Sequence, residues 1–172
     1  HFRGLKMWFQ VVSYLKFLAK STNEHGVHSP FVFKYVTECL YSKKRLHRKR
    51  NVNVLLKTIA YFTFESISVK NKPEIEELVK QNLRGIQLDK KIVDLLFVDG
   101  LDTASFQKML SEGKFHNDSL ILVDAIHANK KNLEQWNHLI ALPQITVSID
   151  MYYCGLISIR REQVKEHFMI RI

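Results

Sequence analysis

The chain has 172 residues, of which 46% are hydrophobic and 25% are charged, with only six Gly and three Pro. This length suits one domain with its own core, and the composition excludes a low-complexity or disordered chain. The two cysteines, Cys39 and Cys154, form no Cys-x-x-Cys motif, so we expect reduced thiols rather than a disulfide framework or a thiolate zinc site.

Positive charge is concentrated in one short segment. Lys and Arg number 26 against 17 Asp and Glu, and without this segment the excess of nine falls to three. A solvated loop or helix end is the simplest interpretation, although such a cluster also attracts nucleic-acid phosphates or an anionic membrane surface. No aromatic residue interleaves the run to stack a base. The six residues of this basic segment are Lys43, Lys44, Arg45, Arg48, Lys49 and Arg50.

The N-terminal stretch predicts an amphipathic helix that ends near Ser21 and needs something to cover it. Its apolar residues recur at steps of three and four. Lys and polar residues interrupt the stretch, so it fits neither a membrane span nor a signal peptide, and we expect a cytoplasmic protein. Ser29 and Pro30 then predict the start of a second helix over 30–41. The apolar face of the first helix comprises Leu5, Trp8, Phe9, Val12, Leu15 and Leu18.

The middle of the chain mixes helical and strand patterns. Apolar residues from Val54 to Phe62 predict a third helix after the basic segment, and Glu65–Val69 predicts a short strand. Pro73 opens a helix that reaches Asn82, and a further short strand is expected over Ile86–Leu88.

The second half reads as alternating strands and helices. Ile92–Gly100 and Ser119–Asp124 are almost unbroken apolar runs, typical of strands buried on both faces of a parallel sheet. Each precedes a predicted helix, which indicates βαβ units. The remaining elements are helices over 103–110 and 132–142, an antiparallel edge hairpin of strands 145–149 and 156–159, and a short turn or helix over 163–168.

These elements predict an α/β fold with a mostly parallel sheet and an antiparallel edge hairpin, preceded by N-terminal helices. We expect one domain over residues 1–172, with the helices and basic segment in 1–50 and the α/β core in 51–172. A short sheet leaves an edge or an apolar face exposed, and a homodimer is one way to cover it.

Two carboxylates mark the expected site, because ligands bind beyond the carboxyl ends of strands in open α/β sheets. Asp99 and Asp124 stand at such ends and could hold a cation or a substrate hydroxyl, with Asp102 and His127 nearby. Asp99, Asp124 and His127 are therefore the candidate catalytic residues. In the alternative interpretation, Asp99 belongs to a turn and Asp124 caps the following segment.

A phosphate or nucleotide cradle is not expected at the first predicted strand. The loop that follows it reads Lys70-Asn71-Lys72-Pro73 and has no glycine, and Pro73 removes an amide donor. His25 and His28 could supply two metal ligands, but no third is evident nearby, so we expect no metal site.

Six segments together resemble a bacterial, Bacteroidetes-type group of class I S-adenosylmethionine-dependent methyltransferase-like proteins. The stretch His25-Gly26-Val27-His28-Ser29-Pro30-Phe31-Val32-Phe33 is the most unusual of them. The others are the segments 13–16, 94–100, 122–127, 147–150 with 155–157, and 162–168. The resemblance extends along the chain in the same order and implies a Rossmann-like, methyltransferase-type sheet with a reversed last strand.

The sequence departs from that family where the methyl donor would bind. In such methyltransferases the first strand ends in an acidic, glycine-rich turn and the second strand ends in an acidic residue for the ribose, but Lys70 and Asn71 follow the first strand here. Only 24 residues separate Val69 from Asp94, which indicates the loss of at least one βα unit. Where the family has an Asp-Asp pair, this chain has Asp124-Ala125, so a metal-assisted methyl transfer would lack one metal ligand.

Three hypotheses follow. In the first, the chain is a degenerate methyltransferase-like domain, a pseudoenzyme that needs no cofactor and acts as a binding or scaffold protein for an unidentified protein partner. In the second, it is an active methyltransferase that holds S-adenosylmethionine in an unorthodox way through Asp99, Asp124 and the loop after Val69. In the third, the basic segment and the N-terminal helix anchor it to nucleic acid or an anionic membrane.

Overall fold

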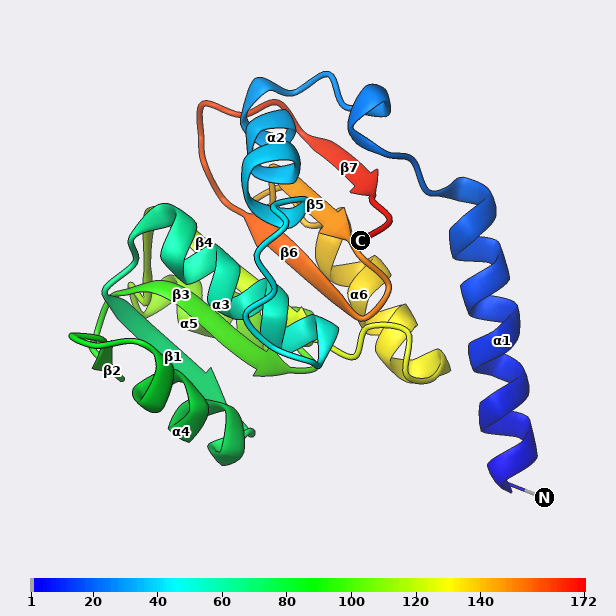
Figure 1. Ribbon diagram of the computed structural model, residues 1–172, viewed down its shortest axis with the longest axis horizontal. Helices are drawn as coiled ribbons and strands as arrows, with labels where there is room; N and C mark the ends of the chain where they lie inside the picture. The colour runs from blue at the N-terminus through cyan, green and yellow to red at the C-terminus, as the bar shows by residue number, and fades with distance from the viewer. Residues whose placement is uncertain (1) are drawn as a thin grey trace.

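The computed structural model describes residues 2–172 and shows helices packed on both faces of a central sheet (Figure 1). Several helices begin at an N-cap residue that the sequence supplies. The Ser29 hydroxyl accepts a hydrogen bond from the Val32 amide, and the side chains of Asp102 and Asn129 cap two later helices in the same way. The helices are α1 (Phe2–Lys20), the 3₁₀ helix η1 (Glu24–Gly26), α2 (Pro30–Lys34), the π-helix η2 (Tyr35–Leu40), α3 (Arg50–Phe62), α4 (Pro73–Asn82), α5 (Thr103–Ser111) and α6 (Lys130–Ala141).

Seven strands form one mostly parallel sheet in the order β2-β1-β3-β4-β6-β5-β7. Only β6 runs against its neighbours, and it pairs with both β4 and β5. The α/β architecture and the antiparallel hairpin predicted from the sequence are thereby confirmed. The strands are β1 (Ser66–Lys70), β2 (Gln87–Leu88), β3 (Val93–Asp99), β4 (Phe115–Asp124), β5 (Val147–Asp150), β6 (Cys154–Ser158) and β7 (Glu166–Met169).

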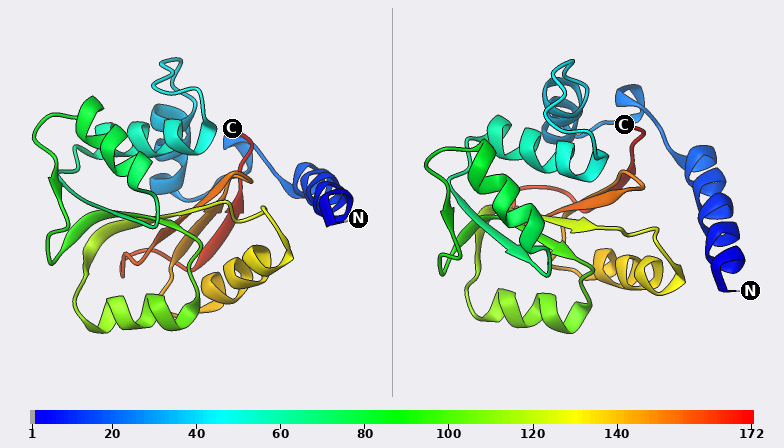
Figure 2. Two further views of the ribbon diagram at one scale, coloured as in Figure 1. Left: turned by 90° about the horizontal axis from the view of Figure 1, so that it is seen from below. Right: turned by 60° about the horizontal axis from the view of Figure 1, so that its bottom comes forward.

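The sheet separates two apolar layers because side chains alternate along each strand. On β3, Leu95 and Phe97 pack with α2, η2, α3 and α4, whereas Leu96 and Val98 pack with α5 and α6. Figure 2 shows these two helical layers on opposite sides of the sheet. The unbroken apolar runs of β3 and β4 are explained by this burial on both faces.

Two details of the predicted C-terminal region are wrong. The expected turn or helix over 163–168 contains strand β7, which pairs in parallel with β5. The hairpin of β5 and β6 is consequently inside the sheet, and β7 forms its edge. The sequence of β7, Glu-His-Phe-Met, has no continuous apolar run that would predict a strand. The strand is defined by its backbone contacts with the neighbouring segment of the chain, among them the Glu166 amide, which donates to the Thr146 carbonyl at 2.8 Å.

Asp94 joins β1 to β3 at the start of both strands. Its carboxylate accepts hydrogen bonds from the amides of Glu65 and Ser66 at 2.9 and 2.8 Å, and it lies 2.9 Å from His116 Nε2. Burial acts to raise the pKa of this carboxyl, but the Ser66 amide, the His116 ring and the Glu65 amide together hold it below its ordinary value. The ionised form of Asp94 therefore stabilises the sheet.

This contact predicts an acid-sensitive contribution to stability. A lowered folded-state pKa gives stability that is present above the unfolded carboxyl pKa of about 3.9 and is lost as the pH falls through the folded value. We expect Asp94→Asn to lower the free energy of unfolding by about 1 to 2 kcal/mol at neutral pH, and by less as the pH falls from about 3.9 through the folded value. Urea unfolding at neutral pH and at acidic pH measures this difference. An equal loss at both would mean that the charge of Asp94 plays no part.

No helix among residues 2–172 is both long and apolar enough to cross a lipid bilayer.

Candidate functional site

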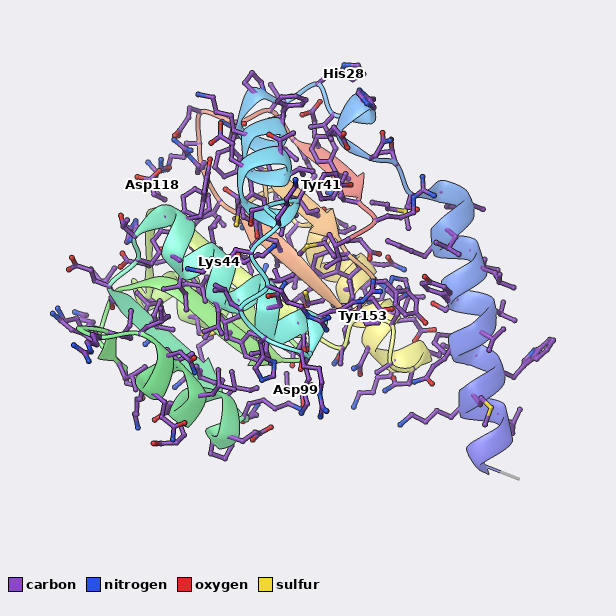
Figure 3. All side chains as sticks on the ribbon, in the orientation of Figure 1. His28, Tyr41, Lys44, Asp99, Asp118 and Tyr153 are labelled. Carbon is purple, nitrogen blue, oxygen red and sulfur yellow. The ribbon has the colours of Figure 1, made fainter. Side chains whose placement is uncertain are left out.

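The carboxyl ends of β3 and β4 bring Asp99 and Asp124 together. The two residues are direct partners in the register of these parallel strands. Side chains from β1, β3, α5 and α6 enclose a cleft of about 770 Å³ beside them, which includes Asn71, Asp99, Asp102, Ser105, Asn132 and Gln135. The sequence thus predicted correctly that Asp99 and Asp124 share one end of the sheet, and Figure 3 shows Asp99 there.

Lys72, which the sequence analysis did not single out as a site residue, reaches both carboxylates. Its Nζ lies 3.1 Å from Asp99 Oδ2 and 4.0 Å from Asp124 Oδ2. The hydrogen bond that the Lys72 ammonium donates to Asp99 is the main reason that the pKa of Lys72 is raised. The ammonium is therefore charged and fixed between the two strand ends.

The loop after β1 directs Lys72 toward this site. Asn71 has a left-handed backbone conformation with φ of 63°, and Pro73 begins α4 immediately after Lys72. Asn tolerates this conformation better than most residues, and Pro at the first helical position fixes where α4 starts. A lysine in a polar loop carries no sequence signal of its own, so only the turn geometry places it.

Asp124 is the more enclosed of the two carboxylates. Its side chain is 8% exposed and accepts hydrogen bonds from Asn51 Nδ2 at 2.8 Å and from the Ala125 amide at 2.9 Å. Burial raises the pKa of Asp124, although Asn51 and Lys72 act against this rise. With these partners, Asp124 joins α3, β4 and the loop after β1.

The other residues near this cleft have structural partners. Asp102 accepts the Ser105 amide at 2.7 Å as the N-cap of α5, a role that the sequence analysis did not assign to it. No group of three or more His, Cys, Asp or Glu side chains within residues 2–172 is arranged to hold a metal ion.

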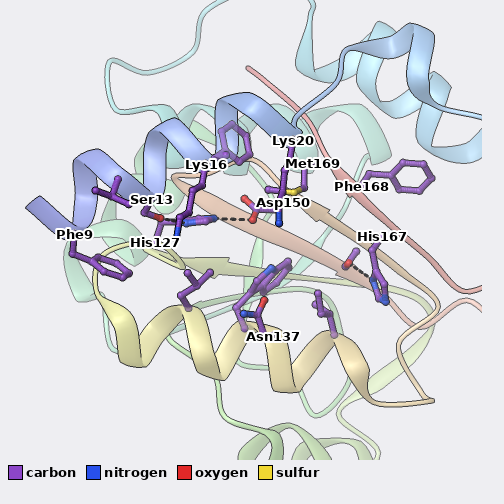
Figure 4. Close-up of a pocket in the computed structure, with 16 residues that line it drawn as sticks. Phe9, Ser13, Lys16, Lys20, His127, Asn137, Asp150, His167, Phe168 and Met169 are labelled. Carbon is purple, nitrogen blue, oxygen red and sulfur yellow. Dashed lines mark hydrogen bonds and ion pairs between the residues drawn. The ribbon is translucent and has the colours of Figure 1, made fainter.

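His127 does not line the cleft beside Asp99, but it lines a neighbouring hollow of about 540 Å³ together with Asp124. Its hydrogen bonds belong to a different cluster. Its Nδ1 is 2.6 Å from Ser13 Oγ on α1, and its Nε2 is 2.7 Å from Asp150 Oδ2 at the end of β5 (Figure 4). When Asp150 accepts from Nε2–H, a neutral imidazole accepts the Ser13 hydroxyl hydrogen at Nδ1. Asp150 ends an apolar parallel strand as Asp99 and Asp124 do, a signal that could have identified it.

The Ser13, His127 and Asp150 side chains have the composition of a nucleophilic triad but not its surroundings. All three residues are at least 94% buried. Ser13 lies in the middle of α1, whose amides are used by the helix and are not free to stabilise an oxyanion. The cluster therefore fastens α1 to the body of the protein, above a mostly apolar cavity of about 420 Å³ between α1 and α6.

The basic segment forms an exposed connection that leads into α3. Its residue Lys44 is labelled in Figure 3. Two of its arginines bind carbonyls of the chain itself: Arg45 Nη2 donates to Arg48 O and Arg50 Nη1 donates to Ile172 O, each at 2.6 Å. Arg50 also stacks over Tyr153, with its Cζ 4.9 Å from the ring centre. These contacts fix the segment and leave its lysines exposed.

Comparison with models of known protein families gave no match for this sequence, and a search of curated protein sequences found no significant relative.

Proposed function

We propose that this chain is a methyltransferase-like binding domain that does not transfer methyl groups. The single observation that carries the proposal is the position of Lys72, whose ammonium is held between Asp99 and Asp124 at the carboxyl ends of β3 and β4. In the resemblance described above, this end of the sheet is where a methyl donor would bind.

Electrostatics argues against a donor beside these carboxylates. S-adenosylmethionine carries a sulfonium and an ammonium group, and Lys72 places one positive charge against the two carboxylates, which weakens their attraction for such a cation. The loop Lys70-Asn71-Lys72-Pro73 also has side chains where a cofactor would approach a glycine turn. These residues do not fit the donor.

The short segment between β1 and β3 supports the same conclusion. Only α4 and the two-residue strand β2 separate β1 from β3 along the chain. This segment has fewer elements than the two strands and two helices that the resemblance implies there, whereas β3, β4 and the helices that follow them are present. A retained core with an altered ligand edge is what we expect of a domain kept for binding or scaffolding.

One observation favours the alternative, an active methyltransferase with an unorthodox donor site. Asp89 directly follows β2, the position at which such enzymes have an acidic residue. Asp89 already accepts a hydrogen bond from Ser68 Oγ at 2.9 Å and lies 4.0 Å from Lys70 Nζ. Donor binding would have to displace these contacts.

Calorimetric titration with S-adenosylmethionine and S-adenosylhomocysteine separates the two functions. We expect no saturable binding to the wild-type protein or to Lys108→Ala, a control that removes an exposed lysine of α5 that contacts Glu112 and lies outside the cleft. Lys72→Ala exposes the two carboxylates, so we expect weak binding of the cationic donor that is absent from the other two proteins. Micromolar, saturable binding by the wild-type protein would overturn the proposal and favour the enzyme.

A further inference from the structure

Helix α1 has five exposed apolar side chains on the face that points away from the rest of the protein. We call Leu5, Met7, Trp8, Val11 and Leu15 the outer face of α1, and their side chains are between 48% and 68% exposed. All views in Figures 1 and 2 show α1 at the periphery of the molecule. We propose that the outer face of α1 docks the protein onto an anionic lipid membrane.

The opposite face of α1 is fastened to the body, which fixes the direction of the outer face. Phe17 is 3% exposed, Ser13 contacts His127, and Gln10 Nε2 donates to the Ala128 carbonyl at 3.3 Å. The Tyr152 hydroxyl also donates to the Gln10 carbonyl at 2.9 Å. The helix therefore presents its apolar face without unfolding, and binding needs no rearrangement of its docked side.

The charge of α1 favours anionic lipid as the occupant. The helix contains no Asp or Glu, and its lysines Lys6, Lys16 and Lys20 are exposed, with Lys16 and Lys20 at the cavity between α1 and α6. In a helix that lies in the membrane interface, such lysines reach anionic headgroups while Trp8 and the aliphatic side chains enter the boundary with the acyl chains. A second copy of α1 would bring more lysines and no carboxylate, so lipid is the better complement.

The shape of the surface agrees with binding in the plane of the membrane. The outer face extends over about three turns of α1, from Leu5 to Leu15. Tyr14, Tyr152 and Tyr153 line a shallow hollow of about 290 Å³ next to Met7 and Val11, which adds aromatic groups of the kind found at membrane interfaces. The chain as a whole carries a formal net charge of +9, which attracts anionic vesicles.

Tryptophan fluorescence offers a direct test because the chain has two tryptophans in opposite environments. Trp8 is 68% exposed and Trp136 is 3% exposed, so a shift on adding vesicles reports Trp8. We expect a blue shift and co-sedimentation with phosphatidylcholine vesicles that contain phosphatidylserine, and much weaker binding without phosphatidylserine. Raising NaCl from about 0.05 to about 0.5 M should weaken the binding.

A pair of triple variants identifies the surface. Met7→Ser, Val11→Ser and Leu15→Ser together should reduce the vesicle partition coefficient by roughly tenfold or more. The matched control replaces three exposed apolar residues on the body, Phe33→Ser, Ile92→Ser and Val164→Ser, which are 43%, 49% and 77% exposed. The control should bind vesicles as the wild-type protein does.

Several results would overturn the proposal. Equal vesicle binding by the two triple variants, or no preference for anionic lipid, would exclude the outer face of α1 as an anionic-lipid site. A wild-type dimer in sedimentation equilibrium that becomes monomeric in the α1 variant, without vesicle binding, would assign this face to a second copy. Loss of vesicle binding only on neutralising Lys43, Lys44 and Lys49 would assign it to the basic segment. None of these outcomes depends on whether the protein binds S-adenosylmethionine.

Discussion

Replacing His127 with Ala should lower the free energy of unfolding by about 3 kcal/mol, because it removes one partner from a buried pair and leaves Asp150 without it. The Asp150 carboxylate would keep only the Tyr152 amide, at 2.8 Å, among these contacts. The variant also loses the stacking of the imidazole on Tyr152, whose ring centre lies 4.8 Å away. Chemical denaturation measures the loss in stability.

The same variant should loosen α1, since Ser13 loses its partner. Limited trypsin digestion reports this change through faster cleavage after Lys16 and Lys20. His116→Ala is a matched control, because this His also contacts an Asp, Asp94, but its side chain is 38% exposed. We expect His116→Ala to lower the free energy of unfolding by less than about 1 kcal/mol and to leave α1 protected from trypsin. Equal effects of the two substitutions would show that the buried pair does not hold α1.

Gly155→Ala should lower the free energy of unfolding by about 2 to 3 kcal/mol, because the added methyl group overpacks a filled core. A Cβ at position 155 would overlap the Cη2, Cζ3 and Cζ2 atoms of the Trp136 ring. Trp136 is 3% exposed on α6, so its ring has little room to move. Thermal or urea unfolding measures the change.

A double-mutant cycle tests whether this overlap is the cause. Trp136→Phe shortens the ring, so it should harm the Gly155→Ala protein less than the wild-type protein, with a coupling of about 1 to 2 kcal/mol. Gly4→Ala is the control, because a Cβ there meets no atom within 4 Å. In helix α1 this change should leave stability equal or raise it by up to about 1 kcal/mol. Additive effects of Gly155→Ala and Trp136→Phe would rule out the ring contact.

Buried strands with continuous apolar runs were the best predicted part of the fold. The runs over 92–100 and 119–124 correspond to β3 and β4, and parallel pairing then places Asp99 beside Asp124. This inference needs only the strand direction and the position of each Asp at a strand end. The α/β class follows for the same reason, since alternating strands and helices form a covered parallel sheet.

Other features depend on contacts between distant segments. Strand β7 has no apolar pattern, and it forms because β5 offers it an unpaired edge. The direction of Lys72 depends on the left-handed conformation of Asn71, and the role of His127 depends on Ser13, which is 114 residues away in sequence. No periodicity in the sequence contains this information.

Helix α1 shows both what the sequence pattern predicts and what it leaves undecided. Its spacing predicts an amphipathic helix, and the helix is present, yet Leu5, Trp8 and Leu15 of the predicted apolar face are exposed. The sequence by itself determined the α/β class, the two central strands and the shared end of Asp99 and Asp124, because local hydrophobic patterns and strand direction suffice for these. Only the tertiary structure decided which face of α1 is docked, where Lys72 points and which partners His127 has, because those depend on long-range packing and on buried hydrogen bonds between segments far apart in the chain.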